Sequence, residues 1–275
     1  MPAVFYNGHM KKHILPTAAI LAVAACAGIF IVVYFVPVSF SADQTADRLW
    51  REVLPRIALS LAMFALVLLC GYKKIFYIKT DGAAKAALWC LPCLLVALAN
   101  FPYSALISGT AAIERADLVW LFLLKCLFIA VAEELLFRGL LLGFLADVFK
   151  QRRHAFLLRV ITSSAVFALF HLLNLAEGAA IGPTLLQVGY TFLTGLMFAA
   201  VTERTHSIWC AVALHFIFDI SGLIVPDLGS GHFQDGVFWA LTAICAAICA
   251  VHLILYAIRK DRDDGADYQN NQQDT

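Results

Sequence analysis

Long apolar runs alternate with short polar segments along almost the whole chain. An α-helix needs about 20 apolar residues to cross the hydrocarbon core of a bilayer, and each run is close to that length. The pattern therefore predicts an all-α protein, a polytopic membrane helical bundle of about eight transmembrane helices. The predicted spans are residues 14–36, 52–72, 85–106, 118–146, 156–175, 184–201, 208–225 and 236–258.

The two ends of the chain need separate interpretation. The run 14–36 follows Lys11 and Lys12, as the core of a signal peptide would. It is longer than the roughly 7–15 residues of such a core, however, and no A-x-A-like cleavage site follows it. We expect it to be retained as a span. Residues 259–275 are charged and rich in Gln and Asn, which predicts a disordered polar tail.

Composition supports the membrane interpretation. Of the 275 residues, 62% are hydrophobic and only 14% are charged, and the mean hydropathy is +0.82. These values exclude an ordinary soluble domain. No basic stripe with interleaved aromatic residues is present, so we expect no nucleic-acid partner. The eight cysteines lie in or beside apolar runs, and we expect them to pack as small apolar side chains.

The number of basic residues alternates between high and low from one loop to the next. If the N-terminus is cytoplasmic, the outer loops hold only Arg48, Arg51 and Arg115, each close to acidic residues. By the positive-inside rule, both termini are predicted to be cytoplasmic, in an inner or plasma membrane. The basic residues then assigned to the cytoplasmic side are Lys11, Lys12, Lys73, Lys74, Lys79, Lys85, Lys150, Arg152, Arg153, Arg159, Arg204, Arg259, Lys260 and Arg262.

The span 118–146 carries charges in its apolar sequence, at Glu133, Glu134 and Arg138. A charge at mid-bilayer costs roughly 2.5–3.5 kcal/mol on insertion scales. Arg138 follows Glu134 by four residues, so the two can pair on one helix face. Glu133 points about 100° away and has no partner in its own helix. An intramembrane carboxylate left without such a partner predicts a functional site.

Two later spans carry polar groups that could face Glu133. In 156–175, His171 shares a helix face with Phe167 and Asn174. In 208–225, His215 and Asp219 are four residues apart. That spacing suits a carboxylate that orients an imidazole, or two groups that converge on one water molecule or metal ion.

Packing is the competing explanation for some of these groups. A single polar side chain in a membrane helix often only links helices, with a contribution of about 0.6 kcal/mol. This interpretation is the stronger one for Asn174 and Gln187. Gly189 and Gly195 are expected to let helices approach closely. Two Glu, an Arg, two His and an Asp on three spans are too costly for packing alone, so we expect a functional cluster.

The chemistry of the cluster is narrowed by motifs that the sequence lacks. There is no H-E-x-x-H, no G-x-S-x-G and no G-x-G-D, so the usual zinc, serine and aspartyl intramembrane protease patterns have no support. Hydrolysis with a carboxylate as general base remains, with Glu133 taking a proton from water. The imidazoles could then donate to the oxyanion or hold a divalent metal that activates the water.

Three motifs on successive spans resemble the CPBP (Abi) family. This family includes type II CAAX prenyl endopeptidases and bacterial bacteriocin-processing or self-immunity proteins. The resemblance covers about residues 117–225, so we expect a three-helix segment 1–116, a catalytic core 117–225, a last helix 226–258 and the polar tail 259–275. The motifs are Glu133-Glu134-x-x-x-Arg138, Phe167-x-x-x-His171 and His215-x-x-x-Asp219.

The resemblance implies a role for each motif. Glu133 would activate the water, and Glu134 with Arg138 would be the supporting pair. His171 and His215 would line a polar cavity as oxyanion donors or as ligands. The expected activity is an intramembrane endopeptidase that cleaves near the C-terminus of a hydrophobic or lipidated substrate, either a peptide or a membrane protein.

The cofactor and the last motif stay open. Asp219 stands where eukaryotic members usually carry Asn, and the extra charge would either favour a cation or orient His215. We expect no obligatory metal; if a divalent metal such as zinc is bound, its ligands would be Glu133, His171 and His215. The alternative functions are a non-catalytic scaffold or immunity protein, and a proton-coupled transporter, since carboxylate and His chains also form proton relays.

Overall fold

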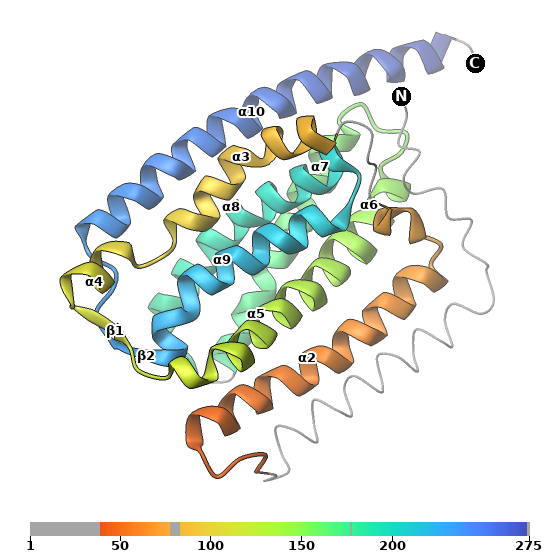
Figure 1. Ribbon diagram of the computed structural model, residues 1–275. Coiled ribbons are helices and arrows are strands. Elements are labelled where there is room, and N and C mark those ends of the chain that lie inside the picture. The colour runs from red at the N-terminus through yellow and green to blue at the C-terminus, as the bar shows by residue number, and fades with distance from the viewer. Residues whose placement is uncertain (1–38, 78–82, 177, 274–275) are drawn as a thin grey trace.

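The computed structural model describes residues 39–77, 83–176 and 178–273. The predicted span 14–36 and the lysines before it lie outside these residues. The described chain is helical almost throughout (Figure 1). Its α-helices are α2 (Gln44–Leu69), α3 (Ala83–Ala99), α4 (Tyr103–Ser108), α5 (Val119–Glu134), α6 (Leu142–Val148), α7 (Ala155–Phe170), α8 (Ile181–Thr205), α9 (Ile208–Leu228) and α10 (Gly236–Gln273).

Short elements join these helices. Two strands pair antiparallel with Ala111 opposite Gly231, which ties the segment before α5 to the end of α9. The remaining elements are η2 (Lys73–Phe76), η3 (Ala116–Leu118), η4 (Leu135–Leu141), η5 (His171–Leu175), β1 (Ala111–Ile113) and β2 (Gly229–Gly231).

Five described helical segments are long and apolar enough to cross a membrane, namely α2, α7 with η5, α8, α9 and α10. The predicted all-α class is therefore confirmed, and the chain is an integral membrane protein. The charged span 118–146 forms one continuous helical rod through α5, η4 and α6. The total of eight spans stays a prediction, because the first of them lies outside the described residues.

The element η4 is a π-helix that starts immediately after Glu134. A π-helical turn is wider than an α-helical turn, is rare, and occurs often at functional sites. Here it carries Arg138 and separates α5 from α6. The sequence pattern predicted a helix at this position but did not predict the change in its winding.

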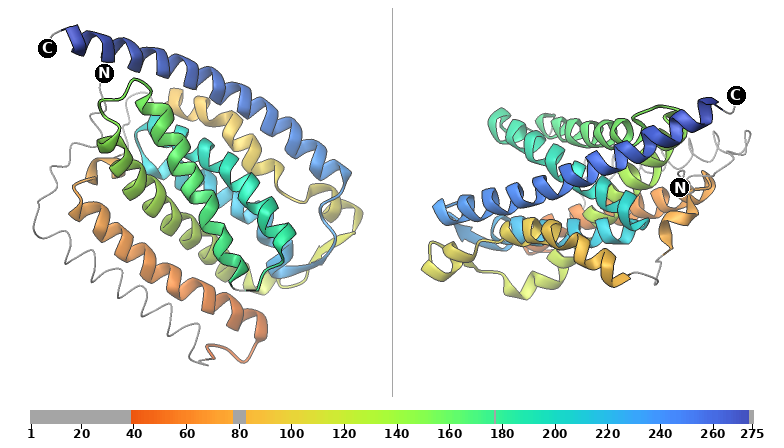
Figure 2. Two further views of the ribbon diagram at one scale, coloured as in Figure 1. Left: turned by 180° about the vertical axis from the view of Figure 1, so that it is seen from behind. Right: turned by 90° about the horizontal axis from the view of Figure 1, so that it is seen from above.

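The rod formed by α5, η4 and α6 lies near the centre of the bundle. α5 packs between α2 and α9, α8 packs against α7 and α9, and α3 packs against α9 and α10. In Figure 1, α2 lies at one edge and α10 at the opposite edge. Figure 2 shows α7 and α8 as a layer over α9. Three elements far apart in sequence, η4, α8 and α9, therefore meet around residues 133–138.

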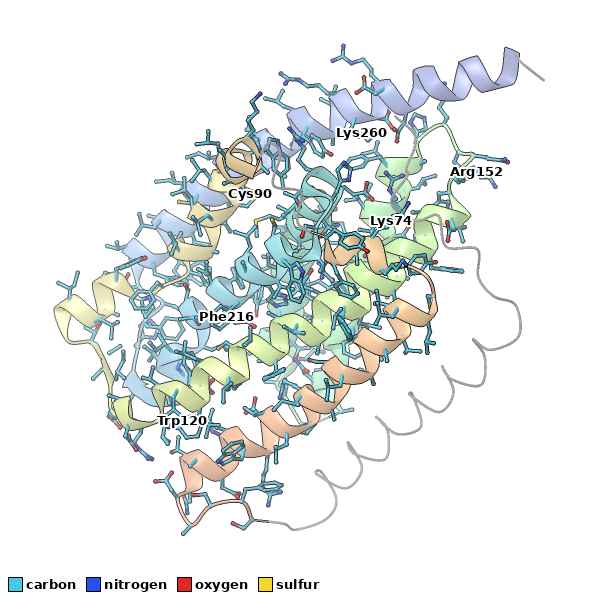
Figure 3. All side chains as sticks on the ribbon, turned by 45° about the vertical axis from the view of Figure 1, so that its right-hand side comes forward. Lys74, Cys90, Trp120, Arg152, Phe216 and Lys260 are labelled. Atoms are coloured by element: carbon cyan, nitrogen blue, oxygen red, sulfur yellow. The ribbon has the colours of Figure 1, made fainter. Side chains whose placement is uncertain are left out.

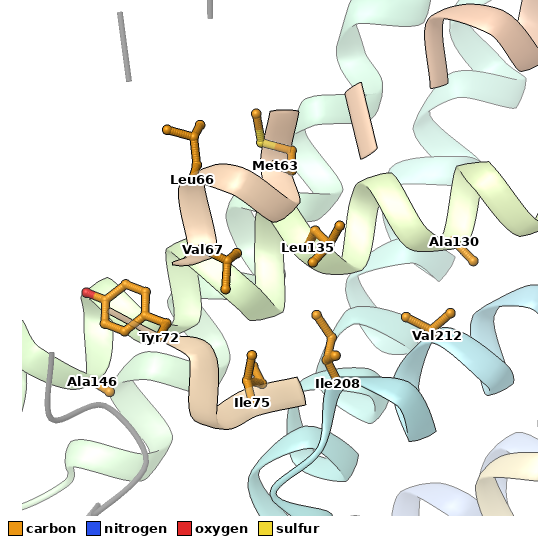
Figure 4. Close-up of a cluster of buried hydrophobic side chains, with 10 residues drawn as sticks. All are labelled: Met63, Leu66, Val67, Tyr72, Ile75, Ala130, Leu135, Ala146, Ile208 and Val212. Carbon is orange, nitrogen blue, oxygen red and sulfur yellow. The ribbon is translucent and has the colours of Figure 1, made fainter. Parts of the chain in front are cut away.

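One buried apolar cluster fixes α2 against the central rod and against α9 (Figure 4). Membrane helices associate mainly through close packing, since lipid tails are as apolar as the side chains. Gly139 shows how close this packing is, because a Cβ atom there would lie 2.8 Å from Cγ2 of Val67. The members of the cluster are Met63, Leu66, Val67, Tyr72, Ile75, Ala130, Leu135, Ala146, Ile208 and Val212.

Glycine at two other positions tests the predicted close helix approach. A Cβ at Gly195 would lie 3.1 Å from Cβ of Ser164 on α7, so the prediction is confirmed there. A Cβ at Gly189 would meet nothing within 4 Å. The prediction for Gly189 is wrong, because this residue lies on an exposed part of α8.

Helix ends account for the other differences from the predicted spans. α2 begins eight residues before the predicted 52, because Asp43 caps it by accepting a hydrogen bond from the backbone N of Ala46 at 2.8 Å. The span 85–106 breaks between α3 and α4. The tail is helical as far as Gln273, so its predicted disorder is wrong over 259–273. There Lys260 pairs with Asp264 at 2.6 Å, and such i,i+4 pairs stabilise a polar helix.

The two ends of the bundle differ in character. Lys74, Arg152 and Lys260 lie towards one end, and Trp120 lies towards the other (Figure 3). Trp120 makes an edge contact with Trp50, with ring centroids 5.9 Å apart. Tryptophan is enriched at membrane interfaces. Lys74, Arg152 and Lys260 thus lie towards the end of the bundle opposite Trp120, and which of the two ends faces the cytoplasm stays a prediction.

Candidate functional site

Glu134 lies at the centre of a buried ionic group. One of its oxygens, Oε1, accepts hydrogen bonds from Nη1 of Arg138 at 2.9 Å and from Nδ1 of His215 at 2.8 Å. Glu134 and Arg138 are wholly buried, and His215 is 5% exposed. Charge-assisted bonds of this kind are the strongest hydrogen bonds in proteins. The predicted Glu134–Arg138 pair is formed, and it also holds the imidazole of α9.

Arg138 also contacts two other helices. Its Nη2 donates to the backbone oxygen of Gly195 at 3.2 Å. Its guanidinium carbon lies 4.5 Å from the ring centroid of Phe167 and 5.4 Å from that of Phe198. A cation over an aromatic face is stabilised, and more so where water is excluded. Arg138 therefore joins η4 to both α7 and α8.

His215 faces three carboxylates. Because a carboxylate can only accept a hydrogen bond, Nδ1–H of the imidazole donates to Glu134. The second ring nitrogen, Nε2, faces the two other carboxylates. Nε2 lies 3.7 Å from Oε2 of Glu133 and 3.6 Å from Oδ1 of Asp219. The ring of Phe198 stacks on the imidazole, with centroids 4.8 Å apart and planes at 19°. The predicted neighbours Glu133, His215 and Asp219 are thus brought together.

The two glutamates differ in their access to solvent. The side chain of Glu134 is 0% exposed, whereas that of Glu133 is 25% exposed. This difference follows from the angle of about 100° between consecutive helical residues. In the described part of the chain, Oδ2 of Asp219 is buried and accepts no hydrogen bond. Glu133 and Asp219 therefore retain oxygens that can accept a hydrogen bond from a bound molecule.

His171 lies at the junction of α7 and η5. A carbonyl oxygen can only accept, so the 3.0 Å contact between Nδ1 and the backbone oxygen of Phe167 places the proton on Nδ1. Its ring also makes an edge contact with the Phe167 ring, whose centroid is 5.1 Å away. Among the described residues, no hydrogen bond or ion pair joins His171 to Glu133 or His215. Phe167 contacts both imidazoles and lies between them.

The predicted metal ligands can be tested against this geometry. Glu133 and His215 approach each other, but His171 is not linked to either. In residues 39–77, 83–176 and 178–273, no three His, Cys, Asp or Glu side chains are arranged so as to hold a metal ion. The three residues are not assembled as a ligand set in this structure.

Asn174 and Gln187, which were predicted to link helices, are hydrogen-bonded to each other. Nδ2 of Asn174 donates to Oε1 of Gln187 at 2.8 Å, which links η5 to α8. Tyr190, one turn beyond Gln187, was not predicted as a site residue. It lies near enough to Asp219 and Glu133 to experience their charges. The sequence indicates this position only through the spacing of three residues between Gln187 and Tyr190, which places both on one helix face.

A second ionic cluster was also missed. The ammonium of Lys125 lies 2.8 Å from carboxylate oxygens of both Asp227 and Glu52. Arg48 donates to the backbone oxygen of Asp227 at 2.8 Å. The sequence does contain an indication of this cluster, because the charged residue Lys125 interrupts the same apolar run as Glu133. Its partners lie on α9 and α2, more than 70 residues away in sequence.

An apolar cavity lies apart from both clusters. It has a volume of about 360 Å³ and opens between α7, α8 and α10, with Val160, Met197 and Leu253 in its wall. Its lining contains no charged residue. The cavity can hold hydrocarbon, but it offers no group for hydrolysis.

One comparison with known proteins finds a match in the central part of the chain. Residues 115–221 match the family model described as Type II CAAX prenyl endopeptidase Rce1-like. The match contains every predicted site residue, from Glu133 to Asp219. No curated protein and no solved structure matches the chain. This match, together with the five long apolar helical segments, supports intramembrane protease activity in general. The central part of the chain is thus similar to the Rce1-like type II CAAX prenyl endopeptidases, in agreement with the CPBP resemblance.

Proposed function

We propose that the protein is an endopeptidase that cleaves a bond near the C-terminus of a hydrophobic or lipidated substrate, with water activated by Glu133. The observation that carries the proposal is the position of Glu133. It is the exposed member of the Glu133–Glu134 pair, and its carboxylate lies beside Nε2 of His215. The family match supports proteolysis in general.

Glu133 acts as the general base in this proposal. The distances of 3.7 and 3.6 Å from Nε2 of His215 to Glu133 and Asp219 exceed a hydrogen bond. They place these three polar atoms within reach of one water molecule. Glu133 takes a proton from that water as the oxygen attacks the peptide carbonyl, and later returns it to the leaving amine.

His215 acts as the oxyanion donor. This role requires the doubly protonated imidazolium, which the three surrounding carboxylates favour. Its Nδ1–H is then held by Glu134, and its Nε2–H faces the reacting atoms. Asp219, whose Oδ1 lies 3.6 Å from Nε2, attracts that Nε2–H electrostatically and so helps to orient the ring. In other enzymes, loss of one oxyanion donor lowers kcat by roughly 10²–10³.

His171 is assigned to the wall of the substrate site. With its proton fixed on Nδ1 by Phe167, the Nε2 lone pair is left to accept a hydrogen bond from a substrate N–H. Glu134 and Arg138 are positioning residues, because they contact His215 and the surrounding helices rather than the proposed water site.

The bundle is proposed to sit in an inner or plasma membrane with its basic end in the cytoplasm. The residues at that end include Lys74, Arg152 and Lys260 (Figure 3). Under the positive-inside rule, this arrangement places the C-terminal end of α10 in the cytoplasm.

The test compares terminal peptides of the membrane proteome from cells that express the wild type, Glu133→Gln or Glu114→Gln at equal levels. Glu114 is exposed and lies outside the proposed site, so it is the matched control for loss of one carboxylate. New C-termini and their released fragments should appear with the wild type and with Glu114→Gln but not with Glu133→Gln. Identical profiles for wild type and Glu133→Gln would refute the proposal and favour a non-catalytic scaffold.

The same assay addresses the metal. The proposed steps use protein groups alone, so a chelator should leave the new termini unchanged. If a chelator removed the new termini and added zinc restored them, we would conclude that a bound metal, and not Glu133 alone, activates the water.

A further inference from the structure

The apolar cavity between α7, α8 and α10 extends along the helix axes. On α10 its wall runs from Ala246 to Ala257, which is a length of about 16 Å. The hydrocarbon core of a bilayer is about 30 Å thick, so the cavity is as long as the acyl-chain layer of one leaflet. Its volume of about 360 Å³ is roughly twice that of a cavity of about 150 Å³ that holds benzene, which gives room for about twelve carbon atoms.

The cavity lies in the half of the bundle nearer the basic end. α10 is predicted to cross the membrane over 236–258, and the cavity wall occupies the half of that span that ends at Ala257. On α7 the wall begins at Phe156, and Arg152 precedes it by four residues. Arg152 and Lys260 lie towards the same end of the bundle (Figure 3). One end of the cavity is therefore at the level of the lipid headgroups, and the other is near the bilayer centre.

The wall of the cavity offers contacts for hydrocarbon. Apolar side chains form most of it, and the hydroxyl of Thr194 donates within its own helix, to the backbone oxygen of Thr191 at 3.3 Å. Apolar cavities of this kind stay dry, and the medium around the bundle at this depth is acyl chains. α10 is largely exposed outside the bundle and packs against α3 and α7. A chain in the cavity therefore adds contacts between α10 and α8.

Two arginines lie beside the mouth of the cavity. His154 contacts Asp261 of α10 at 3.0 Å, and Asp261 is one turn beyond Ala257. The segment that precedes α7 is thus held against α10 at the headgroup end of the cavity. Arg152 and Arg153 belong to this segment and are exposed. Within residues 39–77, 83–176 and 178–273, neither guanidinium group forms an ion pair with a carboxylate.

Two other cations near this end already have partners. Arg159 is bound by Glu203 at 2.7 Å, and Lys260 is bound by Asp264 at 2.6 Å. Arg152 and Arg153 are therefore the cations available to an anion at the mouth. Arginine suits phosphate because its planar group can donate two parallel hydrogen bonds, and a lipid chain that fills the cavity brings its phosphate to this level.

We propose that the cavity binds an acyl chain of one anionic phospholipid, whose phosphate lies against Arg152 and Arg153. The inference goes beyond the proposed function and does not depend on it. Thr194 and Met197 of α8 line the cavity, whereas the residue that follows Met197, Phe198, stacks on His215. The bound lipid thus supports the outer face of a helix whose inner face holds the ionic group.

The test titrates the full chain, delipidated in dodecylmaltoside micelles, with phosphatidylglycerol or with phosphatidylcholine of the same acyl chains. Native mass spectrometry counts the bound lipids. The wild type should bind one phosphatidylglycerol about 30-fold more tightly than phosphatidylcholine, because two arginines attract its net charge. Phosphatidylglycerol should also raise the unfolding temperature, since a ligand of the folded state stabilises it.

Variants of the arginines test the headgroup site. Arg152→Gln/Arg153→Gln should bring the affinities for the two lipids close together. Arg259→Gln/Arg262→Gln is the matched control, because it removes two arginines from the same end of the bundle but from the face of α10 opposite the cavity wall. The control should keep the full preference. All four side chains are exposed, so these variants keep the test independent of folding.

Variants of α10 test the chain site. Ala250 lines the cavity, so Ala250→Phe fills part of it and should lower the affinity for both lipids roughly tenfold. Ala247 is exposed on the same helix and is not part of the wall. Ala247→Phe should therefore leave both affinities unchanged. A thermal unfolding curve for each variant separates lost binding from lost structure.

The contrary outcomes are specific. Equal affinity of the wild type for the two lipids overturns the headgroup site, and an unchanged affinity of Ala250→Phe overturns the chain site. Equal stabilisation by inorganic phosphate assigns the arginines to a free anion and also overturns the proposal. Displacement of phosphatidylglycerol by a farnesylated peptide assigns the cavity to a substrate chain instead of a lipid of the bilayer. None of these outcomes bears on the catalytic role of Glu133, which the assay of new termini tests separately.

Discussion

At the residue scale, the proposed function divides two neighbouring glutamates between two tasks. Glu134 is buried and bound by Arg138 and His215, whereas Glu133 remains partly exposed. One residue of helical rotation separates them, so in the proposed mechanism the same backbone segment presents one carboxylate for support and one for chemistry. His215 connects the two tasks because each of its nitrogens faces one of these carboxylates.

The buried pair should show strong coupling. Arg138→Met leaves Glu134 without its charged partner, and breaking a buried pair by removing one member typically costs about 3–5 kcal/mol. The double variant Glu134→Gln/Arg138→Met should be less destabilised than the sum of the single variants. Unfolding in mixed micelles, monitored by tryptophan fluorescence, measures this double-mutant cycle. Additive effects would show that the pair contributes no coupling.

Sequence reasoning at this scale found residues by their helical spacing. The i,i+4 rule predicted Glu134 with Arg138 and His215 with Asp219, and both pairs lie as predicted. It did not predict that His215 would bond to Glu134, since that contact joins residues 81 positions apart. Lys125 was missed for a similar reason, because its partners Glu52 and Asp227 lie on other helices.

At the element scale, the contact between η4 and α2 limits what position 139 can hold. A Cβ there would lie 2.8 Å from Cγ2 of Val67, and overpacking typically costs about 1–3 kcal/mol. Gly139→Ala should therefore lower stability and activity together. Val67→Ala should restore both in the double variant, which a thermal shift assay and the cleavage assay measure.

Gly189→Ala is the matched control for this substitution. No atom lies within 4 Å of its added Cβ, and alanine favours a helix over glycine by roughly 1 kcal/mol. This variant should be as stable as the wild type or more so. A loss equal to that of Gly139→Ala would show that helix propensity, not the Val67 contact, governs both.

The hydrophobic pattern predicted the helices but not their winding or their ends. The length of each apolar run predicted a span, because the thickness of the bilayer sets how many apolar residues a crossing helix needs. The π-helix η4 has no such signature, because its sequence of Leu, Phe, Arg and Gly suits an α-helix equally well. The tail was assigned to disorder from composition, yet the pair Lys260–Asp264 and the contact of His154 with Asp261 at 3.0 Å accompany a helix there.

At the scale of the whole molecule, the orientation of the bundle is the quantity to measure. Its basic end should lie in the cytoplasm. A fluorescent reporter fused after Thr275 should be active, and alkaline phosphatase fused at the same place should be inactive. Phosphatase inserted in the loop after Ile113 should give the opposite result. The reverse pattern would invert the proposed topology.

The two ionic clusters have a consequence for how the protein is made. Lys125 and Asp227 are 102 residues apart, and Glu133 meets His215 only when α9 is present. During synthesis, α5 therefore reaches the membrane with charges that cost roughly 2.5–3.5 kcal/mol each at mid-bilayer. It has only Glu52 of α2 and its own Glu134–Arg138 pair to offset them. We therefore expect α5 to insert stably only after α9 has been synthesised, so that insertion of the helix with the proposed catalytic residue waits for the second half of the chain.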